Sequence, residues 1–130
     1  MGTTFAPEFP LTVRDVAEDS GVAPSAVRFY ETHRVVTAYR TAGNQRRFDN
    51  SAACRIRVAK VAQRIGLSVR EIAEVFNELP PDPQSDDWAK VARILIDESE
   101  RRIAALKAEL ASLQSGEKLC KLSAPPAHTA

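Results

Sequence analysis

The stretch LTVRDVAEDSGVAPSAVRFYE, residues 11–31, predicts two short helices joined by a tight turn. Thr12 can cap a first helix over Val13–Asp19, because its hydroxyl can accept a hydrogen bond from the first turn. Gly21 breaks that helix, and Pro24 suits the first turn of a second one.

The spacing within this stretch is typical of a helix-turn-helix motif. A small residue four positions before the turn glycine lets the helices cross closely, and later apolar positions lock the second helix. These positions are Ala17, Gly21, Val22, Val27 and Tyr30. An ordinary helical hairpin can share these features by chance and stays open as the alternative.

The second helix, PSAVRFYE, would offer a partner Ser25, Ala26, Arg28 and either Phe29 or Tyr30. Short side chains at its start let a helix sit deep in a DNA major groove, and Arg28 can reach a phosphate or a guanine edge. The helix is therefore a candidate DNA-reading element.

The loop that follows, YRTAGNQRRF (residues 39–48), contains three arginines and no acidic residue. Short extended segments on either side of Gly43, its turn residue, predict a β-hairpin wing. The arginines could then clamp DNA phosphates, and the amide side chains could reach the minor groove or sugar edges. These residues are Arg40, Asn44, Gln45, Arg46 and Arg47. Phe48 should pack the wing onto the third helix, and a flexible basic loop is the alternative.

The chain is nearly neutral, with a formal net charge of +1, but its charge is unevenly spread. Residues 25–64 hold nine Lys or Arg against two acids, Glu31 and Asp49. A basic block in a neutral chain favours a polyanionic partner, and nucleic acid before a membrane because no amphipathic anchor accompanies it. A solvated face of scattered arginines is the alternative.

The rest of the chain also predicts helices. A third helix should end near Gly66, and the capping box SVRE (residues 68–71) opens a fourth that the Pro-rich segment LPPDP stops at Leu79. Asp86 opens a fifth helix that lasts until Gly116.

Apolar and small residues recur along the fifth helix at alternating spacings of three and four, which is a heptad seam. They are Ala89, Ala92, Ile96, Ser99, Ile103, Leu106, Leu110 and Leu113. About 30 residues of helix extend roughly 45 Å, too long for a small domain to bury, so the seam should meet a second copy. The Ile and Leu members are the expected dimerisation residues. A helix folded back on its own domain is the alternative.

This order of elements resembles the MerR family of bacterial transcription regulators. The segment at 11–31 resembles the family's DNA-reading segment, and AGNQRRF is similar to the wing of the superoxide-sensing SoxR branch. RIRVAKVAQRIGLSVREIAEVFNELP resembles that branch's third and fourth helices, and the similarity covers about residues 11–122.

The resemblance implies a homodimer, joined by an antiparallel coiled coil, that twists or bends an overlong promoter spacer so that RNA polymerase can engage both promoter elements. The expected fold is mainly α: a winged helix-turn-helix DNA-binding domain followed by a long dimerisation helix. The expected boundaries are 1–10 for an N-terminal arm, 11–80 for the DNA-binding domain, 81–85 for a linker, 86–115 for the coiled-coil helix, and 116–130 for a sensor-loop remnant and disordered tail.

The resemblance also implies residue roles, including backbone contacts from the arginines of the second helix and wing. The full expected DNA-binding set is Thr12, Arg14, Ser25, Arg28, Tyr30, Arg40, Asn44, Gln45, Arg46, Arg47 and Lys60. Arg55 and Trp88 match positions where the SoxR branch lays one subunit against its partner's sensor loop. With Cys120 they form the candidate sensor.

Two departures from the family pattern matter. Arg34 stands where these relatives commonly have Gly, so the turn after the DNA-reading helix lacks its easy left-handed residue. The SoxR branch holds a two-iron cluster on four close cysteines, whereas this chain has Cys120 there and Cys54 far away. Iron–sulfur sensing is therefore excluded for a single chain, and cysteine-pair metal sensing lacks its second thiolate. We expect no metal and no cofactor.

What the chain senses stays open. Lys118 and Lys121 could lower the thiol pKa of Cys120 and favour its oxidation or alkylation, although an inert packing role is the alternative. A small apolar or cationic ligand beside Trp88 is another possibility. A DNA-binding repressor or architectural factor without an inducer, and a helical protein–protein adaptor, are the alternative functions.

Other classes of protein are disfavoured. No apolar stretch approaches the roughly 20 residues that span a bilayer, and the N-terminus lacks the basic start and apolar run of a signal peptide. Two distant cysteines fit a reducing cytoplasm. His33 and His128 have no associated acid and nucleophile, and no phosphate-binding glycine loop occurs, so we expect no enzyme.

Overall fold

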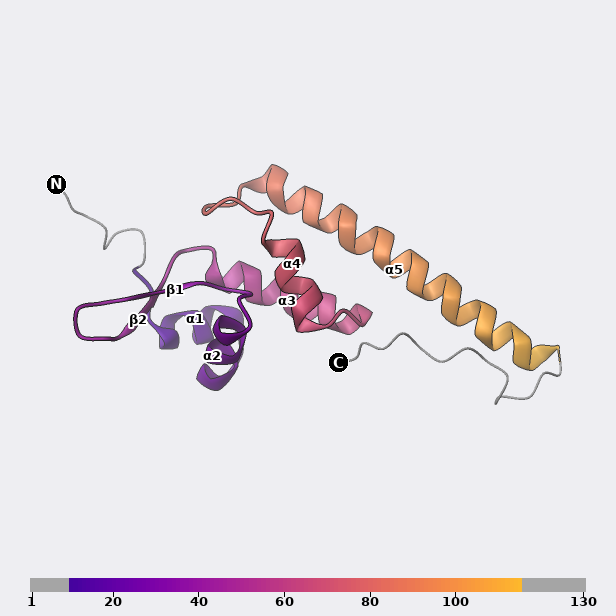
Figure 1. Cartoon of the computed structure of the whole chain (residues 1–130), viewed down its shortest axis with the longest axis horizontal. Coiled ribbons are helices and arrows are strands. Elements are labelled where there is room, and N and C mark those ends of the chain that lie inside the picture. Colours follow the sequence, from indigo (N-terminus) through magenta and orange to yellow (C-terminus); the bar gives the residue numbers. More distant parts are fainter. Residues whose placement is uncertain (1–9, 116–130) are drawn as a thin grey trace.

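The computed structural model describes residues 10–115, which form five helices and one two-stranded hairpin. In chain order these are α1 (Val13–Ser20), α2 (Pro24–Thr32), β1 (Ala38–Arg40), β2 (Arg46–Phe48), α3 (Ala52–Ile65), α4 (Val69–Phe76) and α5 (Ser85–Gln114). Figure 1 shows the first four helices and the hairpin gathered together, while α5 runs out from them as one long rod. The expected mainly helical fold with a wing and a long last helix is confirmed.

α1 and α2 form the predicted helix-turn-helix. Thr12 caps α1 in a capping box, since its hydroxyl accepts a hydrogen bond from the Asp15 N–H at 3.1 Å and its own N–H donates to the Asp15 carboxylate at 3.0 Å. Hydrogen bonding of the Asp15 carboxylate to the Thr12 backbone, and secondarily to the Thr12 side chain, lowers the pKa of Asp15 because it favours the charged form. Gly21 closes α1 in the left-handed region, at φ 75°. The helix ends at Ser20, one residue later than predicted.

β1 and β2 form the predicted wing, an antiparallel hairpin in which Arg40 lies directly opposite Arg46. Its turn differs from the prediction, because Asn44 and not Gly43 takes the left-handed conformation, at φ 62°. Asn tolerates this region better than most residues, since its short polar side chain can bond locally. The Thr41 N–H donates to the Gln45 carbonyl at 2.9 Å, which leaves three residues in the loop, and such a loop commonly ends in a left-handed residue.

The base of the wing is fixed to the helices. Leu11 and Phe48 exchange backbone hydrogen bonds, with N···O distances of 3.0 and 2.7 Å. The Phe48 side chain is completely buried in one cluster with Val16, Val27 and Ile56, which come from α1, α2 and α3. Phe48 was predicted to pack the wing onto the third helix, and it is buried in the core to which α3 contributes Ile56.

α3 and α4 are joined by a turn at Gly66, which has φ 113°. The predicted capping box opens α4: Ser68 Oγ accepts from the Glu71 N–H at 3.1 Å, and the Ser68 N–H donates to the Glu71 carboxylate at 2.7 Å. α4 ends at Phe76, earlier than predicted, because the next residues form a tighter turn in which the Leu79 N–H bonds to the Phe76 carbonyl at 2.9 Å.

α5 begins one residue earlier than predicted, and its first part packs on the other helices. Val91 and Leu95 are its buried residues. Farther along, Arg102 Nη1 donates to the Gly66 carbonyl at 2.7 Å. In the described part of the chain, no helix combines the length and hydrophobicity needed to span a bilayer.

Candidate nucleic-acid interface

α2 presents a face of small, basic and aromatic residues to solvent. Ser25, Arg28 and Phe29 are exposed, whereas Val27 and Tyr30 are buried, at 0% and 6% exposure. This division follows from 3.6 residues per turn, which places the first three on one side of the helix. The exposed side has the small residue at its N-terminal end that a groove-reading helix needs.

The choice between Phe29 and Tyr30 at the surface is resolved by burial. Phe29 is 45% exposed, and its ring lies 4.5 Å from the His33 ring, centroid to centroid. Tyr30 donates its hydroxyl to Gln63 Oε1 of α3 at 2.7 Å, and burial raises its pKa. The DNA contact expected of Tyr30 stays a prediction, but its hydroxyl already joins α2 to α3.

Each wing arginine is held by a hydrogen bond within the protein. Arg40 donates to the Asn44 carbonyl at 3.1 Å, and Arg47 donates to the Arg46 carbonyl at 3.1 Å. Arg46 instead donates through Nε to the Glu31 carboxylate of α2 at 2.7 Å. The first two guanidinium groups are therefore bonded to neutral partners, whereas the charge of Arg46 is paired.

The other expected DNA contacts lie at several places on the surface. Arg14 and Lys60 are exposed on α1 and α3, and Asn44 is exposed at the wing tip. The hydroxyl of Thr12 is engaged in the α1 cap. The side-chain oxygen of Gln45 accepts a hydrogen bond from a wing arginine at 3.2 Å. Their roles toward DNA stay predictions.

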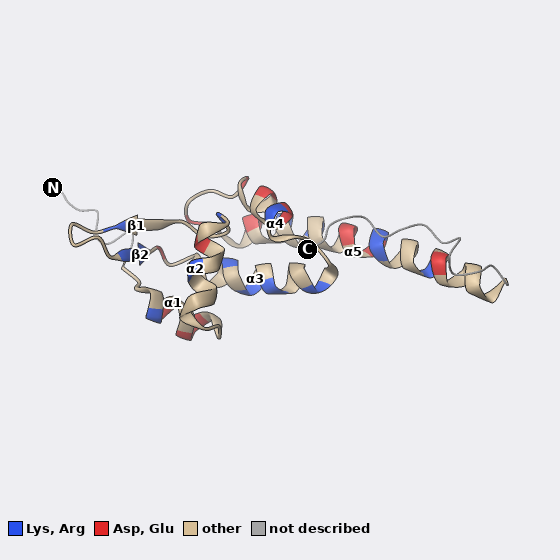
Figure 2. Cartoon of the chain, turned by 60° about the horizontal axis from the view of Figure 1, so that its bottom comes forward, with Lys and Arg blue, Asp and Glu red and all other residues tan. Residues whose placement is uncertain are grey.

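α3 adds a basic row that sequence reasoning assigned only in part. Arg57, Lys60 and Arg64 are exposed and spaced three and four residues apart, so they share one side of the helix. Figure 2 shows basic residues following this side of α3, beside α2. Arg57 donates to the Asp19 carbonyl at the end of α1, which joins the row to the helix-turn-helix. The regular spacing from Lys60 is the sequence signal for the other two.

Arg34 adopts the left-handed conformation that its position requires, at φ 66°. A residue with a Cβ pays roughly 1–2 kcal/mol there, because the Cβ crowds the following carbonyl. The turn is nevertheless formed: the Val35 N–H donates to the Tyr30 carbonyl at 2.9 Å, and Val35 and Val36 are buried. Burial of the two valines offsets the unfavourable backbone of the arginine.

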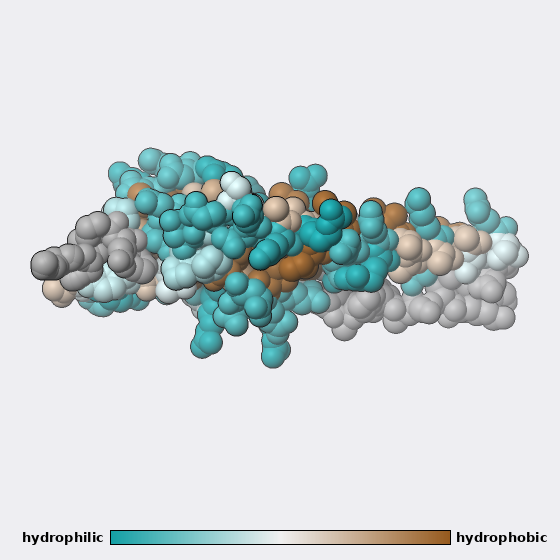
Figure 3. Space-filling model, turned by 90° about the horizontal axis from the view of Figure 1, so that it is seen from above, coloured by the Kyte–Doolittle hydropathy of each residue, from teal (hydrophilic) through white to brown (hydrophobic). Residues whose placement is uncertain are grey.

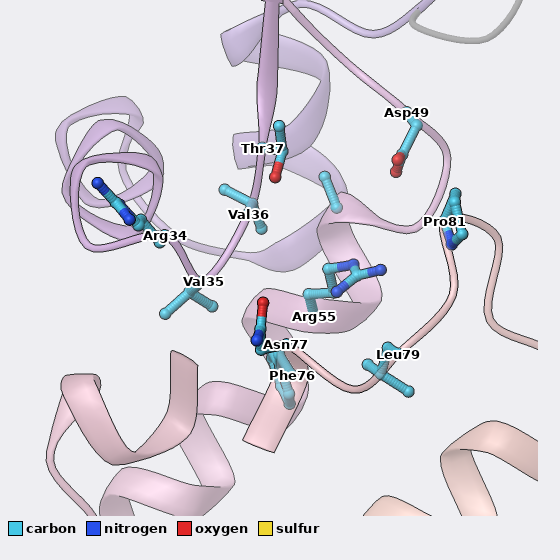
Figure 4. Close-up of a pocket in the computed structure, with 11 residues that line it drawn as sticks. Arg34, Val35, Val36, Thr37, Asp49, Arg55, Phe76, Asn77, Leu79 and Pro81 are labelled. Atoms are coloured by element: carbon cyan, nitrogen blue, oxygen red, sulfur yellow. The ribbon is translucent and has the colours of Figure 1, made fainter. Parts of the chain in front are cut away.

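Arg55, a candidate sensor residue, lies in a hollow of about 330 Å³ between the wing base, α3 and the end of α4. Figure 4 shows its guanidinium among the lining residues, with Arg34 at the side. Arg55 donates to Ser51 Oγ at 2.9 Å and to the Pro80 carbonyl at 3.1 Å. Burial lowers the pKa of Arg55, and the charge of Asp49 opposes that shift.

Trp88, the second candidate, lies in a different hollow of about 330 Å³ between α3 and α5. This hollow is almost wholly apolar, and the exposed Cys54 lies at its side. Trp88 packs edge-on against Phe76, with ring centroids 5.9 Å apart. Cys120 lies outside the described residues, and Arg55 and Trp88 line different hollows. Within residues 10–115, no three His, Cys, Asp or Glu side chains gather as a metal site would require.

Comparison of the sequence with known protein families identifies the family of this chain. A family profile described as MerR HTH family regulatory protein matches residues 11–79, and one described as MerR, DNA binding, matches residues 54–115. This chain belongs to the MerR family. The MerR resemblance inferred from the helix-turn-helix and wing residues is confirmed, and the chain is a DNA-binding transcription regulator of that family.

Individual relatives agree with this MerR assignment. The HTH-type transcriptional activator SoxR homolog of Chromobacterium violaceum is 35% identical over 101 residues, which cover 76% of this chain and 68% of the homolog. A crystal structure assigned to a MerR family transcriptional regulator from Listeria monocytogenes has a TM-score of 0.53 at 22% identity, with 81% of each chain covered. HiNmlR, described as a MerR family regulator lacking the sensor domain and bound to promoter DNA, has a TM-score of 0.51 at 21% identity and covers 81% and 85% of the two chains.

Proposed function

We propose that this MerR-family regulator is a homodimer that binds promoter DNA specifically and distorts an overlong spacer so that RNA polymerase can engage both promoter elements. The observation that carries the proposal is an apolar row on α5, whose members are 43–60% exposed. They are Ile96, Ile103, Leu106, Leu110 and Leu113. Figure 3 shows hydrophobic side chains gathered centrally and continuing along α5. Such a row at heptad spacing supports pairing with a second α5.

The length of α5 supports an antiparallel pair. Val91 and Leu95 anchor the first part of α5 to its own DNA-binding domain, so an antiparallel pair puts the two domains at opposite ends of a rod. A helix of 30 residues is about 45 Å long. Half-sites one turn of DNA apart are separated by about 34 Å, which is of the same order.

In this proposal each face of the DNA-binding domain has its own role. α2 enters the major groove, where Ser25 permits close approach and Arg28 contacts a base edge or phosphate. Arg40 and Arg47 of the wing contact backbone phosphates, and so does the basic row of α3. The phosphate contacts fix the position of the domain, and α2 supplies sequence recognition.

We further propose that an unidentified small-molecule or redox signal acts on the dimer. The apolar hollow beside Trp88 supports a small ligand, and Cys120 is the residue that would support a thiol response. A regulator without an inducer is the second candidate, which is supported by the fold it shares with a protein described as lacking the sensor domain.

The proposal is tested by selecting genomic fragments with the purified full chain and then measuring its affinity for a selected duplex and a scrambled one. We expect the selected duplex to bind at least about a thousandfold more tightly, with affinity falling steeply as salt rises. Transcription in vitro by RNA polymerase should respond to the protein on the natural spacer and lose that response when the spacer is shortened to the optimal length. Equal affinity for both duplexes would contradict sequence-specific regulation.

A further inference from the structure

The wing is joined to the DNA-reading helix by one ion pair that sequence reasoning did not find. Arg46 Nε, at the start of β2, lies 2.7 Å from Glu31 Oε1, in the last turn of α2. The two side chains are 29% and 24% exposed, so both are partly shielded from water. We call this contact the wing–helix pair.

The register of the hairpin explains why Arg46 needs a carboxylate. Arg46 lies directly opposite Arg40, and residues in such a position have Cβ atoms about 4.5–5.5 Å apart, where like charges repel. Arg40 turns its guanidinium to the Asn44 carbonyl, and Glu31 neutralises Arg46.

The pair also restrains the direction of the wing. Side chains alternate along a strand, so Arg46 and the buried Phe48 share the face of β2 that lies against the helices, and Arg47 lies on the other face. The Leu11–Phe48 backbone bonds hold one end of β2, and Glu31 holds its other end. Two anchors at the two ends of one strand fix its angle to α2.

We propose that Arg46 is a positioning residue, whose pair with Glu31 sets the angle between wing and α2 and thereby the match of the protein to its specific DNA sequence. The phosphate contacts of the wing then come from Arg40 and Arg47. This inference rests on the proposed function in that it concerns specific duplex binding. It assigns to Arg46 a role different from the phosphate contact that the sequence predicted.

The first test compares full-chain variants on a selected duplex and a scrambled duplex over a range of salt. Arg46→Gln should weaken binding to the selected duplex about tenfold, the effect of losing one partly buried ion pair, while the slope of log affinity against log salt stays at the parent value. Arg47→Gln, the matched control, should lower that slope by about one on both duplexes. The exchanged variant Glu31→Arg/Arg46→Glu should recover most of the specific affinity, because it restores the pair.

The opposite pattern would overturn the proposal. If Arg46 binds phosphate, Arg46→Gln lowers the salt slope by about one and weakens binding to both duplexes equally. The double variant Glu31→Arg/Arg46→Glu then fails to restore affinity, because a glutamate at position 46 repels the DNA backbone. Equally, Glu31→Gln that leaves specific affinity unchanged would show that the pair positions nothing.

A second test needs no DNA, which separates this inference from the proposed function. Amide hydrogen exchange in the wing of the full chain should be several-fold faster for Arg46→Gln and for Glu31→Gln than for the parent. The double variant should exchange at the same rate as each single variant, because both substitutions break the same pair, and the exchange rates in α4 should be unchanged in all three. If neither substitution changes the hydrogen-exchange rates of the wing amides, the pair does not anchor the wing. If the parent protein binds no duplex but the hydrogen-exchange rates change as expected, the proposed function is contradicted and the wing–helix pair is not.

Discussion

Among residues 10–115, Arg34 is the one whose backbone conformation is least compatible with its side chain. Its φ of 66° lies in the region that glycine adopts without strain. We therefore expect Arg34→Gly to raise the free energy of unfolding by about 1 kcal/mol, since relief of strain exceeds the entropy that glycine adds to the unfolded chain. Urea denaturation measures the change.

The matched control is Arg34→Ala, which removes the guanidinium but keeps the Cβ. It should give no comparable gain in stability, because the crowding persists. If the alanine and glycine variants are equally stable, the left-handed backbone is not a source of strain.

A second residue-scale effect appears at low pH. The pKa of Asp15 is lowered, first by the Thr12 N–H and then by the Thr12 hydroxyl, which both favour the carboxylate. A folded-state pKa below the unfolded value gives stability that is present above the unfolded pKa and is lost as pH falls through the folded one. Asp15→Asn should therefore flatten the fall of stability below about pH 5. The measurement is the unfolding midpoint over a pH series.

Glu18→Gln removes the same charge from an exposed position on α1 outside the cap, and serves as the control. Its pH profile should follow that of the parent. If both variants flatten the dependence of stability on pH to the same extent, then net charge, and not the cap, causes the loss of stability at low pH.

Among the secondary-structure elements, the wing should bind phosphate without reading sequence. Arg47 lies on the outward face of β2 and donates to two neutral oxygens, the Arg46 carbonyl and Gln45 Oε1, so its charge is available to the DNA backbone. Arg47→Ala should weaken binding to specific and random duplexes by the same factor and lower the salt slope by about one. Affinity titrations at several salt concentrations measure both.

Lys90→Ala, which removes a positive charge from the exposed part of α5, is the control and should leave the slope unchanged. A loss confined to the specific duplex in Arg47→Ala would identify the wing as a base reader.

How much the sequence could predict depended on the range of each interaction. The caps at Thr12 and Ser68 bond within three residues, so their side chains were sufficient evidence for both helix starts. The wing–helix pair joins residues 15 apart through the folded chain, and no local pattern marks Glu31 as its partner. The hydrogen bond from the Tyr30 hydroxyl to Gln63 likewise joins residues 33 apart, and no local pattern marks that partner either.

Turn details were harder to predict for a related reason. Gly43 was the natural choice for the wing turn, but strand pairing on both sides of the loop sets which residue becomes left-handed, and that residue is Asn44. At Arg34 the family preference for glycine indicated only that the turn lacks its easy left-handed residue. Burial of Val35 and Val36 retains the turn, and that burial is visible only in the fold.

At the scale of the whole molecule, α5 is the element whose apolar row stays exposed in a single chain. Leu106→Asp together with Leu110→Asp would bury two unpaired charges in the proposed dimer seam, each at a cost of several kcal/mol. We expect the variant to sediment as a monomer and to lose specific DNA binding, because its half-sites are no longer coupled.

The control for this variant is Ala104→Asp together with Ala108→Asp, which places the same charges four residues apart on the opposite side of α5. It should remain a dimer and retain its affinity for DNA. If both variants dissociate, added charge on the helix, and not the seam, is responsible.

The most direct test of the central claim, that α5 couples two DNA-binding domains, is sedimentation equilibrium of the full chain with a selected duplex. The account predicts two chains on each duplex even when duplex is in excess, and no stable complex for the variant with aspartates at 106 and 110. A parent complex of one chain per duplex, with undiminished specific affinity, would contradict it.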